Sequence, residues 1–456
     1  MTTSTLTDLT SQINGLRFVR IIIYIIFFTI PFQIYLNFGS APIVSGYLLT
    51  IFAFALLLLA IPGRGWKVVN SPLFPPLILL GITIILSLIQ VVSLTEYIVK
   101  TLHFIFQVLL YILILNVIST EQEVNRIVRI LLISGLISSW VAITLFFLVN
   151  ILHIDAIFNF LTVRLAPYLY GARAAQLFAI NPYFSWVRTV PGQTDEIIRA
   201  TGLFVTPAEN GYFSACIFFI ALGLRSSFFK SRRKLFIIIL VSCLINILLA
   251  QTRGVWLGMV VGLMYYIFNQ RIIFRPYVLI SMIIFTGIAS IVVIAFLGTQ
   301  NLLSQFNSVI SQQDSSASLR VSTMLTGIGF IKERALIIGV GPGNQDVVFN
   351  ADSSEFDFSA TTHSMYVDLA IGIGLLGLLA YLWLLWRSWK EAVFVKKRSP
   401  SQFLRELSNS YHYMVICLLV IHVFQGNLFG NPKTNLLVWG VIGLISVARR
   451  ISLDEV

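Results

Sequence analysis

The chain has few charged residues and few cysteines for its length. Of its 456 residues only 11% are charged and three are cysteines, whereas 57% are hydrophobic and the mean hydropathy is +0.89. So little charge excludes an ordinary soluble globular protein. Cys216, Cys243 and Cys417 all lie inside apolar runs, and an odd number of such thiols excludes a disulfide framework. The CxxC, HExxH and Walker patterns are missing as well, so no metal ion and no cofactor is predicted.

Long hydrophobic runs are what the sequence has instead. The runs are about 16–25 residues long, enough to cross a hydrocarbon core about 30 Å thick. The first run lacks a small-residue cleavage site, which predicts an uncleaved span rather than a signal peptide. We predict an all-α polytopic membrane protein with about twelve transmembrane helices and a large extracytoplasmic loop that caps the bundle. The predicted spans are 18–37, 43–61, 74–93, 98–118, 128–152, 211–225, 235–250, 254–269, 277–297, 365–386, 411–428 and 434–448.

The distribution of basic residues predicts the orientation in the membrane. With both termini in the cytoplasm, the cytoplasmic segments hold 21 of the 31 lysines and arginines, which is the bias that fixes membrane topology. Topology therefore explains the net charge of +12, and no nucleic-acid partner is expected. The basic clusters 230–234 and 396–398 are predicted to anchor the topology and to contact anionic membrane lipids.

This orientation places two long segments outside the cytoplasm. The first, 153–210, is rich in aromatic residues and arginines, which suits the lipid–water interface. The second, 298–364, is predicted to fold as a cap, with a helix from Ser316 or Ser318 to about Glu333 because its apolar residues recur at helical spacing. The predicted division is transmembrane helices 1–5 in 1–152, the interfacial segment 153–210, helices 6–9 in 211–297, the loop 298–364, and helices 10–12 with a cytoplasmic tail in 365–456.

His363 lies where the large loop meets the hydrophobic helix predicted at 365–386. An imidazole at this junction is wet at one end and fixed by a membrane helix at the other. It titrates near pH 6.5 when unperturbed, so a neutral imidazole accepts a proton from a substrate hydroxyl. We predict His363 as a catalytic residue, and the alternative is a helix cap or a loop contact.

Three arginines on the outer side run against the positive-inside bias. Arg253 lies in the short turn Gln251-Thr252-Arg253-Gly254, Arg320 opens the cap helix, and Arg199 precedes the sixth span. One interpretation is that each side chain reaches out to lipid phosphate. The other is that several of them bind one diphosphate, because guanidinium groups bind phosphate oxygens bidentately and stay charged without a metal.

Small residues follow His363 along the predicted tenth span. Gly374 and Gly377, with Ala370 one turn earlier, form a stripe that lets membrane helices approach closely. Asp368 lies five residues after His363, about 140° round the helix, and is a poor candidate to orient the imidazole directly. Tyr366 is the better placed supporting residue.

A cluster of glycines breaks the cap helix at its end. The segment Gly339-Val340-Gly341-Pro342-Gly343-Asn344 offers backbone N–H groups of the kind that cradle a phosphate. A Gly/Pro cluster is, however, usually a turn, and the sequence leaves both interpretations open.

These residues together resemble the motifs of the O-antigen ligase and polymerase superfamily. The main one is His363-Ser364, nine residues, Gly374, two residues and Gly377. Further similarity, over about 195–450, lies in Arg199-Ala200-Thr201-Gly202-Leu203-Phe204 with Pro207 and Asn210, in Thr252-Arg253-Gly254 with Trp256-Leu257-Gly258, in Arg320 and in Gly339-Val340-Gly341.

The resemblance implies a membrane glycosyltransferase of the GT-C type that needs no metal. Such an enzyme lies in the bacterial cytoplasmic (inner) membrane with its active site on the periplasmic side. It transfers a whole glycan from undecaprenyl diphosphate to an acceptor hydroxyl, with inversion. By resemblance His363 is the base, Arg253, Arg320 and Arg199 bind the diphosphate, and Ser364, Tyr366, Gly374 and Gly377 support them.

Two questions stay open at the level of the sequence. A polymerase extends a lipid-linked repeat and a ligase caps a lipid A-core sugar, and the sequence does not separate these acceptors. Relatives that glycosylate pilins usually add a soluble C-terminal domain. This chain ends at Val456, shortly after its last predicted span, which counts against that group. The other class is a membrane transporter, since some relatives are named as bicarbonate-transport proteins, and His103, His412 and His422 lie in or near spans.

Overall fold

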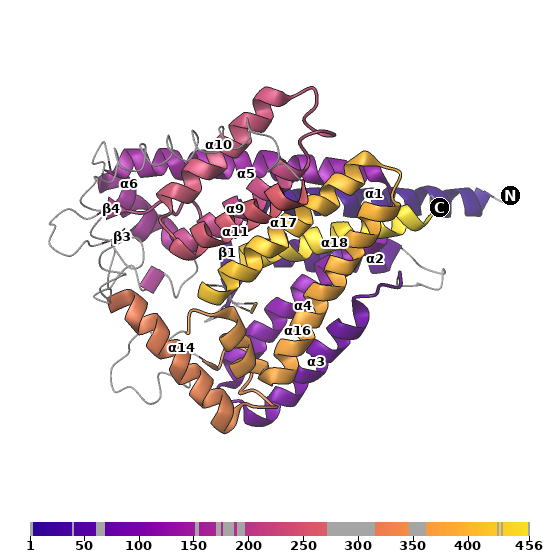
Figure 1. Cartoon of the computed structure of the whole chain (residues 1–456). Coiled ribbons are helices and arrows are strands. Elements are labelled where there is room, and N and C mark those ends of the chain that lie inside the picture. Colours follow the sequence, from indigo (N-terminus) through magenta and orange to yellow (C-terminus); the bar gives the residue numbers. More distant parts are fainter. Residues whose placement is uncertain are drawn as a thin grey trace.

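The structure is a computed structural model that describes residues 3–38, 41–60, 69–150, 155–169, 175–176, 187–188, 197–270, 315–345, 362–425, 428–429 and 432–454. Helices dominate these residues, in agreement with the predicted all-α fold, and two short antiparallel hairpins are the exceptions (Figure 1). The longer helices are α1 (Thr3–Thr29), α2 (Ser45–Ala60), α3 (Phe74–Ser87), α4 (Leu94–Val117), α5 (Glu121–Asn150), α9 (Pro207–Gly223), α10 (Arg233–Leu249), α11 (Arg253–Asn269), α14 (Ser315–Arg334), α16 (Met365–Arg398), α17 (Gln402–Phe424) and α18 (Pro432–Asp454). The short elements are α6 (Asp155–Asn159), the π-helix Phe160–Leu165, α7 (Ala166–Leu169), the hairpin β1 (Tyr35–Phe38) with β2 (Ala41–Val44), the hairpin β3 (Val187–Arg188) with β4 (Ile197–Ile198), and the 3-10 turns Ile30–Phe32 and Leu88–Gln90.

The helices follow the hydrophobic runs of the sequence. Every predicted span overlaps a helix except the ninth, 277–297, which lies outside the described residues. Among the described helices, α4, α5, α16, α17 and α18 are long and apolar enough to cross a membrane. The helices α9, α10 and α11 have 17 residues each, which is the lower limit for a span. The count of twelve therefore stays a prediction.

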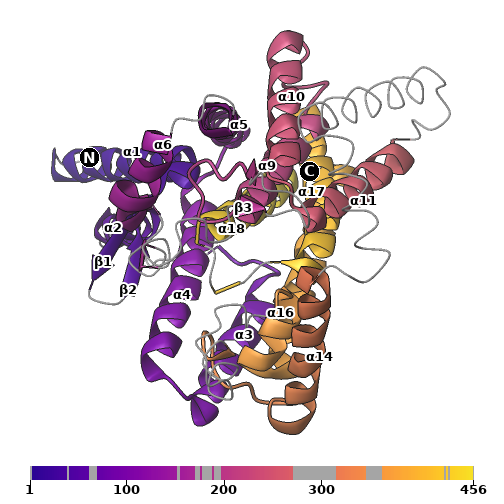
Figure 2. The same ribbon diagram turned by 90° about the vertical axis from the view of Figure 1, so that its left-hand side faces the viewer.

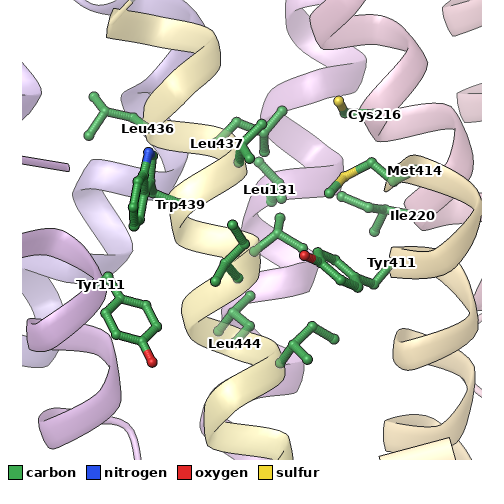
Figure 3. Close-up of a cluster of buried hydrophobic side chains, with 14 of the residues drawn as sticks. Tyr111, Leu131, Cys216, Ile220, Tyr411, Met414, Leu436, Leu437, Trp439 and Leu444 are labelled. Atoms are coloured by element: carbon green, nitrogen blue, oxygen red, sulfur yellow. The ribbon is translucent and has the colours of Figure 1, made fainter. Parts of the chain in front are cut away.

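The helix α18 runs through the middle of the bundle. Its residues are buried almost without interruption from Pro432 to Ala448, and it packs against α4, α5, α9, α16 and α17. Figure 3 shows Trp439 and Leu444 of α18 beside Tyr111 of α4 and Tyr411 of α17. A helix that is apolar on every side is stable only when neighbours cover every side, so α18 forms the core around which the bundle is arranged (Figure 2).

Basic side chains cross-link the helices at one end of the bundle, which we call the basic end. Arg20 of α1 forms an ion pair with Glu123 of α5, at 3.0 Å. Arg450 of α18 donates to the carbonyl of Leu115 at the end of α4, at 2.6 Å. Both chain termini lie on this side (Figure 1). The opposite end, which we call the His363 end, carries the start of α16.

A break in α16 receives a loop from the glycine-rich segment. Gly374 has φ 76 and ψ 172, which interrupts the helix. The groups that lose their helical partners there find new ones in the loop: the Val340 amide donates to Ile371 O at 2.9 Å, and the Gly341 amide donates to Gly372 O at 2.8 Å. The Leu375 amide donates to Leu336 O at 3.2 Å. The loop thus satisfies backbone groups that would be expensive to leave unpaired inside a membrane protein.

This arrangement corrects two interpretations of the sequence. The amides of Val340 and Gly341 are used on α16, so these two are not free to cradle a phosphate. Gly374 accommodates a loop rather than another helix, because an added Cβ would lie 2.0 Å from the Ile337 carbonyl oxygen. Gly377 makes room within α16 itself, since its Cβ would lie 2.4 Å from Cγ1 of Ile373.

We predict that Gly374→Ala destabilises the protein by at least about 2 kcal/mol, because alanine resists positive φ and its Cβ collides with backbone. The matched control is Gly81→Ala in α3, where nothing lies within 4 Å of the added Cβ and alanine should be neutral or stabilising by up to about 1 kcal/mol. Thermal unfolding of the purified protein in detergent, followed by tryptophan fluorescence, measures both. Equal midpoints for the two variants would contradict the proposed role of the break.

Candidate functional site

His363 lies in a tight turn directly before α16. It is half-exposed, and its φ of 52 puts it in the left-handed region. Histidine is among the few residues with a side chain that are enriched there. Ser364, and not His363, is the N-cap of α16, and its side chain makes no capping hydrogen bond. The imidazole is therefore held just outside the helix, at its positive end.

Hydrogen bonds around Thr362 fix this turn. The Thr362 hydroxyl lies 2.5 Å from Oδ1 of Asp368 and 3.2 Å from the carbonyl oxygen of Ser364, and its oxygen accepts from the Ser364 amide at 3.3 Å. Thr362, Ser364 and Asp368 are all buried. A carboxylate in the first turn of a helix is also favourable for the helix dipole. Asp368 thus supports the His363 turn through Thr362. The sequence analysis did not predict this role for Thr362.

Tyr366 ties the start of α16 to α17. Its hydroxyl donates to the Leu419 carbonyl at 2.9 Å, and its ring meets the His422 ring edge-on, with centroids 6.3 Å apart. Nε2 of His422 lies 3.2 Å from the hydroxyl of Tyr212 on α9. Because the Tyr366 proton is donated to α17, this residue supports His363 through the helix rather than by donating to the imidazole. His422 is a buried packing residue that links α9, α16 and α17.

Arg253 is the first residue of α11 and is exposed at the His363 end. The next residue packs tightly on the last turn of α17, since a Cβ added to Gly254 would lie 2.9 Å from Cβ of Phe424. The preceding turn contains Gln251, which is buried and has φ 48. The helix α17 packs against both α11 and α16 (Figure 1), so its last turns connect Arg253 with the His363 turn.

The segment after Arg199 is bound to the end of α10. The Ala200 amide donates to Leu249 O at 3.0 Å, and the Ala200 carbonyl accepts from Nδ2 of Asn210 at 2.9 Å. Leu249 lies only four residues before Arg253, so Arg199 and Arg253 stand on adjoining backbone segments. This pairing ties Asn210 to the segment that follows Arg199.

Lys433 fixes the same segment from the other side and was also missed by sequence reasoning. It is buried, and its ammonium donates to Leu203 O at 2.6 Å and lies 5.6 Å from the centroid of the Phe204 ring. The signal was present in the sequence: a lysine at a helix end predicted to lie outside runs against the positive-inside bias. A buried ammonium needs such partners.

Arg320 lies in α14, whose boundaries agree with the predicted cap helix. The side chain of Arg320 lies outside the described part of the structure. Its helix packs on the His363 turn, because a Cβ added to Gly327 would lie 3.1 Å from Cγ2 of Thr362. Arg320 is seven residues before Gly327, about 10 Å along the helix axis. The segments of Arg199 and Arg253 are thus linked to the His363 turn through α10, α11 and α17, and the helix of Arg320 packs on that turn directly.

The described ranges contain no group of three or more His, Cys, Asp or Glu side chains that could hold a metal ion. The chemistry available at the His363 end, in these ranges, is that of an imidazole in a fixed turn, permanently charged guanidinium groups and helix N-termini. Such a set accepts a proton and stabilises negative charge.

We predict that Thr362→Val destabilises the protein by about 1–3 kcal/mol, because it leaves a buried carboxylate without its hydroxyl donor. Thr362→Ser keeps the hydroxyl and is the matched control. Hydrogen–deuterium exchange of the amides of 364–368 should be faster in the valine variant and close to wild type in the serine variant. Unchanged exchange in Thr362→Val would show that the turn is held by other contacts.

Comparison with known families adds one match. Residues 238–382 match the family model described as O-Antigen ligase, a range that includes Arg253, Arg320, His363 and both glycines of the motif. No curated protein matches the chain. The family match over residues 238–382 confirms the resemblance predicted from the His363 motif.

Proposed function

We propose that the protein transfers a glycan as one block from undecaprenyl diphosphate to the hydroxyl of an acceptor sugar, with inversion. The observation that carries the proposal is that α17 links the start of α16, after His363, to the start of α11 at Arg253, at one end of the bundle. The family match over 238–382 supports glycan transfer.

In this proposal His363 is the general base. A neutral imidazole takes the proton of the acceptor hydroxyl as that oxygen attacks the anomeric carbon. Its position is set before substrate binds, because Thr362 and Asp368 hold the turn. A positioned base contributes roughly 10²–10⁴-fold to the rate, and the fixed geometry adds to this by reducing the orientational freedom lost at the reaction step.

The arginines stabilise the leaving group. As the bond from the anomeric carbon to the diphosphate oxygen breaks, negative charge grows on the diphosphate. Arg253 at the start of α11 places a guanidinium and a helix N-terminus at the same end as His363, and both favour an anion. Arg199 and Arg320 complete the proposed set. Diphosphate is a good leaving group, so fixed positive charge supplies most of the stabilisation without a metal.

The proposed setting is the bacterial inner membrane. The bias of lysine and arginine supports a cytoplasmic location for the basic end. In this proposal the His363 end faces the periplasm, where the lipid-linked donor presents its glycan. The donor and a lipid-linked or lipid A-core acceptor are the proposed partners, together with membrane lipids. The family match supports glycan transfer, and it gives no support to the transporter alternative.

The acceptor is decided by one experiment on the purified protein. Incubation with lipid-linked repeats alone gives a ladder of products if the enzyme is a polymerase. Addition of a lipid A-core acceptor gives a capped core if it is a ligase. Solute flux into proteoliposomes that contain no lipid-linked glycan, with no transfer in either incubation, would refute the proposed function.

We predict that His363→Asn and His363→Gly both lower the rate of glycan transfer by about 10²–10⁴-fold, because each removes the base. Asparagine and glycine both tolerate the left-handed backbone, so the melting temperature should stay near that of the wild type. Product formation from radiolabelled donor and thermal unfolding are measured on the same preparations. Turnover near wild type in either variant would exclude His363 as the base.

We predict that Arg253→Lys lowers transfer by at least about tenfold, since one ammonium replaces a bidentate fork. The matched control is Arg164→Lys, an exposed arginine of the interfacial segment, which should keep the wild-type rate. The measurement is the rate at saturating and at limiting donor. If both lysine variants behave alike, Arg253 only anchors the protein to lipid.

A further inference from the structure

A polar pocket of about 270 Å³ lies at the basic end, away from the proposed active site. It forms where α9, α11 and α16 end and where α17 begins. Its wall contains three cations, Arg225, Lys396 and Arg405, and one carboxylate, Glu406. The volume is far more than the roughly 10–15 Å³ that one water molecule needs, so the pocket has room for a small ligand.

In the described residues, the acceptors bound by the three cations are all neutral. Arg225 donates to the hydroxyl of Tyr266 at 2.8 Å and also lies over its ring. Lys396 donates to Oδ1 of Asn269 at 3.1 Å. Arg405 donates to the carbonyls of Ser399 and Pro400 at 3.0 and 3.3 Å. None of the three forms an ion pair within the part of the chain that the structure describes.

The carboxylate of Glu406 is already occupied. It accepts from the Ser227 amide at 2.9 Å, the Ser227 hydroxyl at 2.7 Å and Nε2 of Gln402 at 3.0 Å, and it also accepts from the Ser226 hydroxyl. The three donors of Ser226 and Ser227 hold it against the segment after α9, and Gln402 is a neighbour on α17 itself. The pocket thus has three positive charges against one negative charge, an excess of two, with its acidic group turned to other partners.

One wall residue lacks a donor. Oδ1 of Asn409 is a buried acceptor without a hydrogen bond in the described structure, and Asn409 lines the pocket. A buried carbonyl without a partner is unfavourable by about 1–3 kcal/mol. A ligand that fills this pocket should therefore carry an O–H or N–H group beside its negative charge.

Topology alone explains only part of this arrangement. Cytoplasmic lysines and arginines are expected in any membrane protein, and cations near the ends of α9 and α16 offset the helix dipoles. Lys397 and Arg398 are exposed and do not line the pocket, so these two effects explain them fully. Neither effect accounts for a concave pocket in which the Glu406 carboxylate is already hydrogen-bonded and Oδ1 of Asn409 has no donor in the described structure.

We propose that this pocket binds a phosphate group. Guanidinium forks from Arg225 and Arg405 and the ammonium of Lys396 match phosphate oxygens, and a P–OH or a headgroup hydroxyl or amine supplies the donor for Asn409. The phosphate comes either from an anionic lipid headgroup of the adjoining membrane surface or from a free phosphate ion in solution. The site is independent of the proposed glycan transfer at the other end.

The test is isothermal titration of the whole protein in detergent, at constant ionic strength, with sodium phosphate and separately with soluble short-chain phosphatidylglycerol. The pocket variant is Lys396→Gln/Arg405→Gln, and the matched control is Lys397→Gln/Arg398→Gln, which removes the same charge from exposed neighbours. The pocket variant should bind at least about tenfold more weakly, and the control should bind like the wild type. Arg225→Lys, which keeps the charge but loses the fork, should weaken binding even if the double variant does not fold.

The outcomes separate the two sources and the two ends of the protein. Binding of phosphatidylglycerol alone, lost in the pocket variant, identifies a lipid headgroup, and binding of phosphate identifies a free anion. Three results overturn the proposal: no saturable binding of either probe, equal loss in the pocket and control variants, or binding that persists in the pocket variants and disappears in Arg253→Gln.

Discussion

The backbone pairing at the break of α16 is the interaction on which the His363 end depends. At Gly374 the helix gives up its own hydrogen bonds, and the amides of Val340 and Gly341 take over the freed carbonyls of Ile371 and Gly372. The segment that follows the cap helix is thereby fixed to the helix that follows His363. Two motifs far apart in the sequence are parts of one structural device, in which glycines allow backbone to meet backbone at a distance that any Cβ would prevent.

Packing contacts that start at this break also fix the position of His363 relative to Arg253. α14 and the glycine loop lie against the first three turns of α16, and Tyr366 ties that helix to the α17 carbonyl of Leu419. The last turn of α17 in turn packs on Gly254, beside Arg253. Each link is a short contact between rigid helices, so the separation of His363 and Arg253 is set by packing rather than by flexible side chains. Preorganisation of this kind is what an electrostatic contribution to catalysis requires.

Sequence reasoning predicted the helices well because hydrophobic runs are a strong signal. The cap helix lies where the pattern put it, and most of the predicted spans overlap a helix. His363 lies at the predicted loop–helix junction, and its catalytic role stays a prediction. Thr362, Asp368 and Lys433 were not predicted as parts of the site. Their roles depend on which carbonyl or hydroxyl lies opposite them in space, and Lys433 reaches a segment 230 residues away. The role of Gly374 was misread for a similar reason: a small residue predicts close approach but not whether a helix or a loop approaches.

The backbone of His363 argues for function more directly than its side-chain type does. Left-handed backbone is unfavourable for a residue with a side chain by about 1–2 kcal/mol, and glycine would adopt it without that penalty. Thr362 and Asp368 maintain this conformation, and both are buried polar groups that need hydrogen-bond partners of their own. Apolar residues at both 362 and 368 would need no such hydrogen bonds. Strain supported by its surroundings in this way is typical of functional sites, and the group that gains from it here is the imidazole, held at a helix N-terminus with its ring half-exposed.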